Sequence, residues 1–100
     1  MSHEEHFVWT TTRRIKPGTR AEFEQAWQPP EFPAGMLRAH ELWSEDEEEI
    51  VGISFWDSQE SCDRYRGSAP ETERREAMAP FVLEESSSVY RGRELSIPGH

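Results

Sequence analysis

Residues 49–56 read Glu-Ile-Val-Gly-Ile-Ser-Phe-Trp and have the strongest β-strand pattern of the chain. Successive side chains of a strand point to opposite faces of its sheet. One face of this strand carries Val51, Ile53 and Phe55. The other carries Gly52, Ser54 and Trp56. Because large apolar side chains occur on both faces, we expect both faces of the sheet to be covered.

The segments around this strand alternate between strand and helix patterns. Further strands are predicted at residues 7–15, at 35–43 and within 81–95. Helices are predicted at residues 19–27, 58–66 and 70–79, the last two forming one helical region interrupted at Gly67. The order β-α-β-β-α-β predicts an α+β, ferredoxin-like fold with a four-stranded antiparallel sheet and the helices on one face. We expect a single domain over residues 1–100, with a core at about 6–95 and polar tails.

The helix starts have recognisable capping patterns. Residues 19–22 read Thr-Arg-Ala-Glu, which predicts a capping box at the first helix. Asp57, with Glu60 three residues later, is the expected cap of the second helix. Pro70 is expected at the first position of the third helical segment, because proline fits where no backbone N–H is needed.

Composition excludes several classes of function. The 100 residues contain 11 Lys and Arg against 20 Asp and Glu, a net charge of −9. This sign disfavours nucleic acid and anionic membranes as partners. The chain has one cysteine, Cys62, and no spacing typical of a zinc site, so no metal is expected, and His3 and His6 lie in a tail. The polar N-terminal residues are unlike a signal peptide, and we expect a cytoplasmic protein.

The two-faced strand predicts self-association. Helices that all lie on one face leave the other face of the sheet uncovered, and an uncovered apolar sheet face on a protein of this size is an association site. Pairing of two copies about a two-fold axis is the commonest solution. We therefore expect a homodimer, with burial under the proline-rich loop or the tail as the alternative.

Two longer segments resemble a known family. Residues 53–66 read ISFWDSQESCDRYR, and residues 69–78 read APETERREAM. With Lys-Pro-Gly at 16–18 and Pro-Ala-Gly at 33–35, the chain resembles the antibiotic biosynthesis monooxygenase (ABM) family over residues 6–95. Proteins of that family are dimeric α+β barrels, formed when two ferredoxin-like sheets pack together.

The resemblance implies a reaction that needs no cofactor. Several members of the family oxidise aromatic polyketides or quinols, and the deprotonated substrate itself passes an electron to O₂. By this resemblance the protein is a small monooxygenase that binds a flat aromatic substrate, stabilises its anion and excludes water. The haem-degrading branch of the family uses a histidine on the last helix, which this sequence lacks.

Individual residues match the family pattern unevenly. Trp56 matches the tryptophan of the third strand, which lines the pocket between sheet and helices. Arg75 matches an arginine that can meet a phenolate or peroxy anion. The catalytic oxygenases carry an Asn where this chain has Gly52 and a Tyr where it has Cys62. These two departures favour an alternative, a dimeric module that binds an aromatic ligand or a partner protein without converting it.

A third alternative is polyketide cyclase or isomerase chemistry, because related barrels perform it. His40 is the only histidine within the predicted fold and would be the general base. It shares a strand face with Arg38 and Leu42. For all three hypotheses the expected pocket residues, which core packing would explain equally well, are Trp9, Thr11, Phe23, Trp27, Gly52, Ser54, Cys62, Tyr65 and Met78.

Overall fold

The computed structural model of the protein describes residues 5–29 and 31–99. Its elements, in chain order, are β1 (His6–Ile15), α1 (Arg20–Trp27), β2 (Met36–Trp43), β3 (Glu49–Trp56), α2 (Gln59–Arg66), α3 (Ala69–Met78), the short 3₁₀ helix η1 (Ala79–Phe81) and β4 (Val82–Gly92). Every predicted strand and helix is present, within a few residues of its expected bounds. His3 lies outside the described residues, whereas His6 is the first residue of β1 rather than part of a tail.

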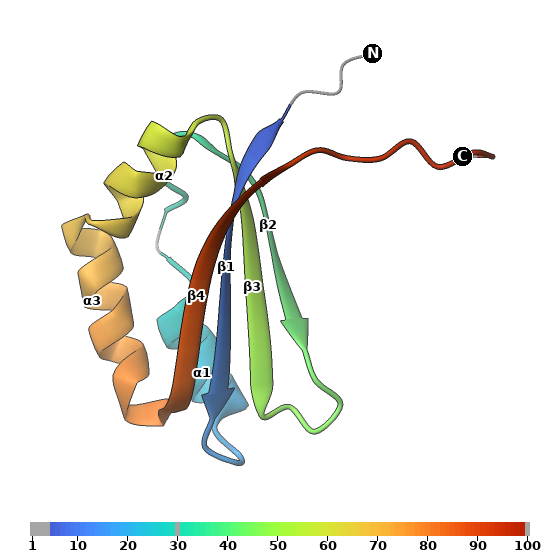
Figure 1. Cartoon of the computed structure of the whole chain (residues 1–100). Coiled ribbons are helices and arrows are strands. Elements are labelled where there is room, and N and C mark those ends of the chain that lie inside the picture. Colours follow the sequence, from blue (N-terminus) through green and yellow to red (C-terminus); the bar gives the residue numbers. More distant parts are fainter. Residues whose placement is uncertain (1–4, 30, 100) are drawn as a thin grey trace.

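The four strands form one antiparallel sheet in the order β2-β3-β1-β4. This is the ferredoxin-like order that the element pattern predicts. All three α-helices lie on one side of the sheet, and the segment after β4 leaves on the other side (Figure 1). The predicted α+β fold is therefore confirmed.

Alternation along the central strands separates a covered face from an uncovered one. On β3, Ile50, Gly52, Ser54 and Trp56 are buried, and the residues between them are half-buried. On β1, which pairs with β3 along its whole length, the buried side chains are those of Trp9, Thr11, Arg13 and Ile15. Both buried rows face the helices, so the helix-free face carries the half-buried residues Val51, Ile53 and Phe55.

The core consists of two clusters beneath the helices. One is formed by Trp9, Trp56, Cys62 and Tyr65, under α2. The other is formed by Ile15, Phe23, Ile50 and Met78, between α1 and the end of α3. Trp56, Phe23, Cys62 and Met78 therefore all belong to the packed interior.

Two of the predicted helix caps are wrong. Thr19 has φ −108° and ψ 12°, and its hydroxyl donates to the carbonyl of Lys16 at 2.6 Å instead of capping α1. At α2 the cap is Ser58 rather than Asp57, because the extended backbone of Ser58 lets its hydroxyl accept from the N–H of Ser61. Ser68 caps α3 in the same way, so Pro70 follows one position later than predicted.

The helices are short compared with helices that cross a membrane. The longest helix, α3, has 10 residues, whereas about 20 are needed to cross a bilayer. Among residues 5–29 and 31–99, no helix is both long and apolar enough to be a membrane span.

Candidate functional site

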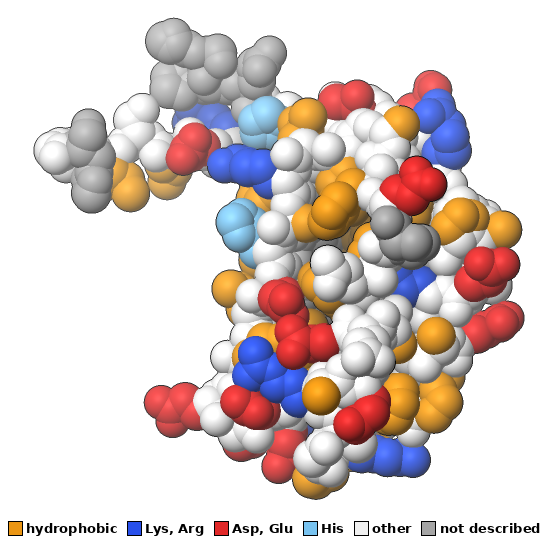
Figure 2. Space-filling view, turned by 180° about the vertical axis from the view of Figure 1, so that it is seen from behind, with side chains coloured by type: hydrophobic (Ala, Val, Ile, Leu, Met, Phe, Trp, Pro, Cys, Tyr) orange, Lys and Arg blue, Asp and Glu red, His pale blue; other side chains and the backbone are white. Residues whose placement is uncertain are grey.

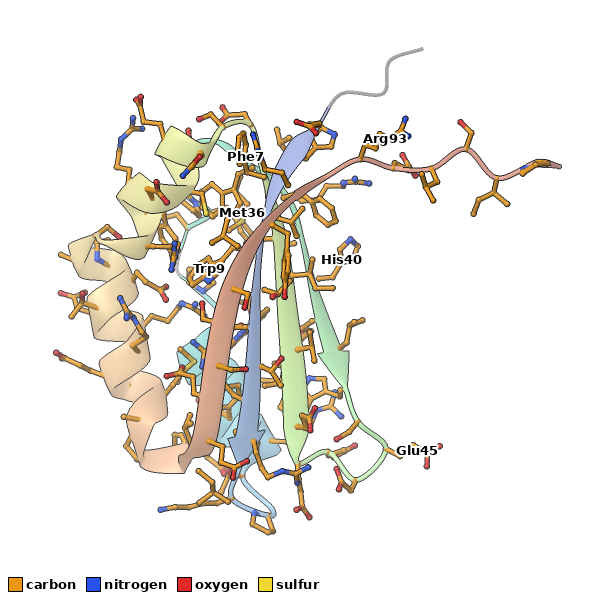
Figure 3. The ribbon with its side chains drawn as sticks, in the orientation of Figure 1. Phe7, Trp9, Met36, His40, Glu45 and Arg93 are labelled. Carbon is orange, nitrogen blue, oxygen red and sulfur yellow. The ribbon has the colours of Figure 1, made fainter. Side chains whose placement is uncertain are left out.

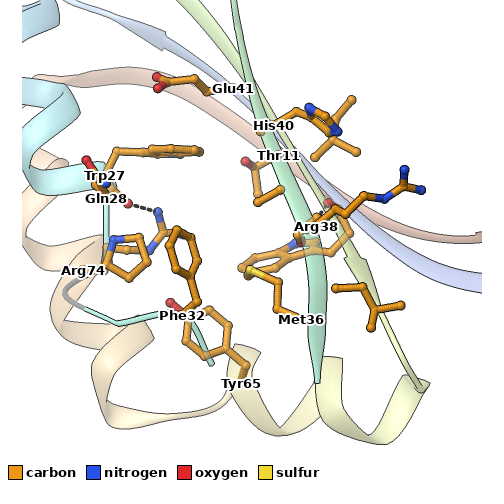
Figure 4. A pocket seen from close by; sticks show the side chains of 17 residues that line it. Thr11, Trp27, Gln28, Phe32, Met36, Arg38, His40, Glu41, Tyr65 and Arg74 are labelled. Carbon is orange, nitrogen blue, oxygen red and sulfur yellow. Dashed lines mark hydrogen bonds between the residues drawn. The ribbon is translucent and has the colours of Figure 1, made fainter. Parts of the chain in front are cut away.

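A cavity of about 520 Å³ lies between the helix-covered face of the sheet and the helices. Volumes of about 300–1,000 Å³ are typical of small-molecule sites. Four aromatic residues line it, and they come from four separate parts of the chain, namely β1, the end of α1, the loop after α1, and α2. These aromatic residues are Trp9, Trp27, Phe32 and Tyr65 (Figure 4).

The sheet side of the cavity is built from small residues. Thr11 of β1 and Gly52 and Ser54 of β3 all line it. Trp56 lies beneath this surface, and its indole N–H donates to the hydroxyl of Ser54 at 2.8 Å. Small side chains on the sheet leave volume for the cavity between the sheet and the helices.

Arg74 places a cation on the helix side of the cavity. Its side chain is 10% exposed and forms a two-pronged ion pair with Glu71, with N–O distances of 2.8 and 3.2 Å. Its third nitrogen donates to the backbone carbonyl of Trp27 at 2.6 Å (Figure 4). Because Glu71 is fully buried, the pair has strong and fixed geometry.

Arg75, the arginine expected at the site, lies elsewhere. Its side chain is 49% exposed, donates to the carbonyl of Arg66 at 3.0 Å and does not line the cavity. Successive helix residues differ in direction by about 100°, so Arg74 faces the cavity and Arg75 faces outward.

His40 lies on β2, the edge strand that borders the cavity. The register pairs it with Ile53, which places its side chain on the helix-free face. There its ring packs edge-to-face on Phe55 at 6.1 Å, and Arg38 lies over the same ring. Figure 3 shows Trp9 and Met36 on the helix side of the sheet and His40 on the opposite side. His40 is one of the residues that line the cavity, but its ring lies against Phe55 on the helix-free face.

The structure gathers many of the expected pocket residues around this cavity. Those that line it are Trp9, Thr11, Trp27, Gly52, Ser54 and Tyr65. Four expected site residues do not line it, because they fill the core clusters: Phe23, Trp56, Cys62 and Met78.

Burial sets the protonation of two groups near the cavity. Burial, and next the charge of Glu71, raises the pKa of Tyr65, so its phenol keeps its proton and can donate a hydrogen bond. Burial likewise raises the pKa of the Cys62 thiol, which suits packing and not nucleophilic attack.

Several lining residues were not predicted from the sequence. Among them are Gln28, Phe32, Met36, Glu41 and Arg74. Two of them could have been predicted from the sequence. Phe32 is an aromatic residue in a proline-rich loop, and the alternation of β2 places Glu41 on the opposite face from His40. The direction of Arg74 depends on the helix phase, which the sequence pattern leaves open. Within the described part of the chain, no group of three or more His, Cys, Asp or Glu could hold a metal ion.

Comparison with known proteins supports the fold. No family model matches the chain, and no curated protein matches it at the level of sequence. Among solved structures, SnoaB, a cofactor-independent oxygenase from Streptomyces nogalater, is similar with a TM-score of 0.75 and 16% identity, over 95% of this chain and 99% of that one.

Two further solved structures are candidate antibiotic biosynthesis monooxygenases. That of Chloroflexus aurantiacus has a TM-score of 0.73 and 16% identity, over 94% of this chain and 97% of that chain. That of Bacillus cereus has a TM-score of 0.71 and 18% identity, over 94% and 99%. At these identities the likeness shows the fold alone, and the fold of this chain is that of the ABM proteins.

Proposed function

We propose that the protein is a cofactor-independent monooxygenase that oxidises a flat aromatic or quinol-type substrate with O₂. The observation that supports this most strongly is the cavity of about 520 Å³, which is lined by four aromatic side chains and by the largely buried guanidinium of Arg74. Cavities of this kind take planar apolar ligands, and the few polar groups in them fix the orientation. The fold shared with SnoaB, itself a cofactor-independent oxygenase, agrees with this proposal.

The proposed chemistry needs only the substrate and oxygen. In an anthrone-type substrate, an activated methylene carbon between two aromatic rings loses a proton to water to give an aromatic phenolate, which O₂ oxidises. The carbon becomes a carbonyl, one oxygen atom enters the product, and the other leaves as water. The protein binds the ring system between its aromatic walls, and Arg74 favours the anionic form of the substrate. The phenol of Tyr65 and the hydroxyl of Thr11 supply hydrogen bonds.

Oxygen uptake tests the proposal. The purified protein is mixed anaerobically with anthrone, or with a reduced naphthoquinone, and air is then admitted to an oxygen-electrode cell. We expect the wild-type protein to consume oxygen faster than buffer alone does. The Arg74→Ala protein should consume oxygen more slowly than the wild-type protein. Uptake no faster than in buffer across both substrates would reject a monooxygenase of this kind.

A non-catalytic ligand-binding module is the second candidate. Gly52 and Cys62 stand where catalytic relatives are expected to carry Asn and Tyr, and Arg74 is already neutralised by Glu71. Under this alternative, aromatic ligands quench the tryptophan fluorescence and are recovered unchanged. The cyclase alternative gains no support from His40, whose side chain points away from the cavity.

We further propose that the helix-free face of the sheet binds a second copy of the chain. Val51, Ile53 and Phe55 are only half-buried on that face. The segment after β4 also projects on that side and carries Leu95 and Ile97, which are 70% and 65% exposed (Figure 2). A second copy that covered this face would shield both groups of apolar side chains from water.

A further inference from the structure

The four tryptophans of the protein differ in what their indole N–H groups bind. Trp9 donates to the hydroxyl of Ser87 at 2.7 Å, Trp43 to Glu41 at 2.9 Å, and Trp56 to Ser54 at 2.8 Å. Trp27 lines the cavity, and its N–H has no hydrogen-bond partner among residues 5–29 and 31–99. An indole N–H can only donate, so this group is available to an acceptor that enters the cavity.

Trp27 occupies space that Gly52 leaves open. A Cβ placed on Gly52 would lie 3.2 Å from the six-membered ring of Trp27, 3.6 Å from its Nε1 and 3.0 Å from Oγ1 of Thr11. The indole nitrogen and the Thr11 hydroxyl therefore flank the same point above the sheet. Any side chain on residue 52 would displace one of them, so close packing explains why this position is a glycine.

The position of Trp27 is fixed from the helix side. It is the last residue of α1, and Arg74 donates to its carbonyl at 2.6 Å while the guanidinium lies 5.8 Å from the centre of its ring. Arg74 is itself held by the buried carboxylate of Glu71. The indole extends from α1 toward Thr11 and the sheet (Figure 4). A donor held in this way keeps its direction before a ligand arrives, which is the condition for stabilising a developing anion.

We propose that the indole N–H of Trp27 donates a hydrogen bond to the oxygen anion of the bound aromatic ligand, with the Thr11 hydroxyl as its neighbour. Arg13 donates to Oγ1 of Thr11 at 3.2 Å, so the proton of that hydroxyl is free to point at the same oxygen. No proton or electron moves through Trp27. The Trp27 indole N–H and the Thr11 hydroxyl together take the place of a hydrogen-bond donor on β3, because Gly52 has no side chain to donate from. This inference rests on the proposed function, because it needs an aromatic ligand that carries an ionisable hydroxyl.

Alizarin, a planar dihydroxyanthraquinone that changes colour when its phenol ionises, is the probe. Its bound pKa is measured by absorbance titration with the wild-type protein and with Trp27→Phe, which keeps a ring and loses the N–H. We expect Trp27→Phe to raise the bound pKa of alizarin by about one unit and to weaken binding of the anion about tenfold. Anthraquinone, which has no hydroxyl, should bind both proteins alike. Trp43→Phe, which removes an indole N–H engaged with Glu41, is the matched control and should leave the bound pKa unchanged.

A compensating variant keeps the test decisive if Trp27→Phe is poorly folded. Gly52→Asn alone should destabilise the protein, because its side chain meets Trp27 and Thr11. In the double variant Trp27→Ala with Gly52→Asn, the amide fills the vacated space and should lower the bound pKa of alizarin again relative to Trp27→Ala alone. In the wild-type protein, the ¹H–¹⁵N resonance of the Trp27 indole should move downfield with alizarin while those of Trp43 and Trp56 stay in place.

The outcomes separate this inference from the proposed function. If the wild-type protein binds alizarin but Trp27→Phe leaves its bound pKa unchanged, or if the Trp27 indole resonance does not move, the donor role is wrong and the proposed function stands. If the wild-type protein binds neither alizarin nor anthraquinone, the aromatic cavity site is wrong and this inference fails with it.

Discussion

Arg74 and Arg75 are neighbours in sequence with opposite surroundings. Arg74 is 10% exposed and lies 2.8 Å from the fully buried Glu71, whereas Arg75 is 49% exposed and reaches the same carboxylate only at 3.6 Å. Removing Arg74 leaves a buried carboxylate without its main partner, so Arg74→Ala should lower the free energy of unfolding by about 3 kcal/mol. Arg75→Ala should change it by less than about 1 kcal/mol. Urea unfolding of both variants checks this prediction, and equal midpoints for the two would contradict the placement of Arg74.

The thiol of Cys62 predicts a loss of stability at alkaline pH. Burial raises its pKa above the ordinary value of 9.0, so the unfolded chain releases this proton first as the pH rises. The stabilisation is complete below about pH 9 and is lost as the pH rises through the pKa of the folded state. Unfolding free energy measured by urea titration from about pH 8 to about pH 11 should fall less steeply in Cys62→Ala than in wild type.

Tyr65 also contributes to the loss of stability at alkaline pH, in both the wild-type and the Cys62→Ala proteins. Its raised pKa acts in the same direction above its ordinary value of 10.0, so the Cys62→Ala protein should still lose stability at the upper end of the range. Identical slopes for the wild-type and Cys62→Ala proteins between about pH 9 and pH 10 would mean that the thiol is not desolvated in the folded state.

At the scale of elements, the loop between α1 and β2 is fixed to α2 through Gly35. Gly35 has φ +91°, a Cβ there would lie 2.5 Å from Ser61, and its carbonyl accepts from the N–H of Asp57 at 2.8 Å. Gly35→Ala should therefore cost at least about 2 kcal/mol of unfolding free energy, from backbone strain and steric overlap together.

Gly18→Ala is the matched control for Gly35→Ala. Gly18 has φ +77° but nothing within 4 Å of a Cβ, so only the backbone term applies, at about 1 kcal/mol. Thermal unfolding of the two variants compares them directly. A larger loss for Gly18→Ala would show that close packing against Ser61 does not fix the loop.

Elements differ in how far the sequence predicts them. The alternation in residues 49–56 predicted which β3 side chains share a face, since strand geometry alone decides this, but it left open which of the two faces the helices cover. The same alternation placed His40 with Arg38 and Leu42, but only the sheet order identifies their face as the one without helices. Choosing between Arg74 and Arg75 required the exact helix phase. The contact of Trp27 with Gly52 joins positions far apart in the chain, and no local pattern predicts it.

At the scale of the whole molecule, the helix-free face predicts a dimer. Val51→Asp places a charge in the middle of that face, opposite Leu42 in the register, where it would have to be buried without a partner. Sedimentation equilibrium at micromolar concentration should show a dimer for wild type and a monomer for Val51→Asp. Ala77→Asp, on the exposed side of α3, should remain dimeric. A monomeric wild-type protein would contradict self-association through this face.

The central claim is that the cavity directs one oxygen atom of O₂ into an aromatic substrate without a cofactor. The most direct measurement is mass spectrometry of the anthrone product formed by the metal-free, flavin-free protein under ¹⁸O₂. We expect one ¹⁸O atom in the new carbonyl, formed faster than in buffer and more slowly with Arg74→Ala than with wild type. A product without ¹⁸O, or the same rate of incorporation with and without protein, would contradict it.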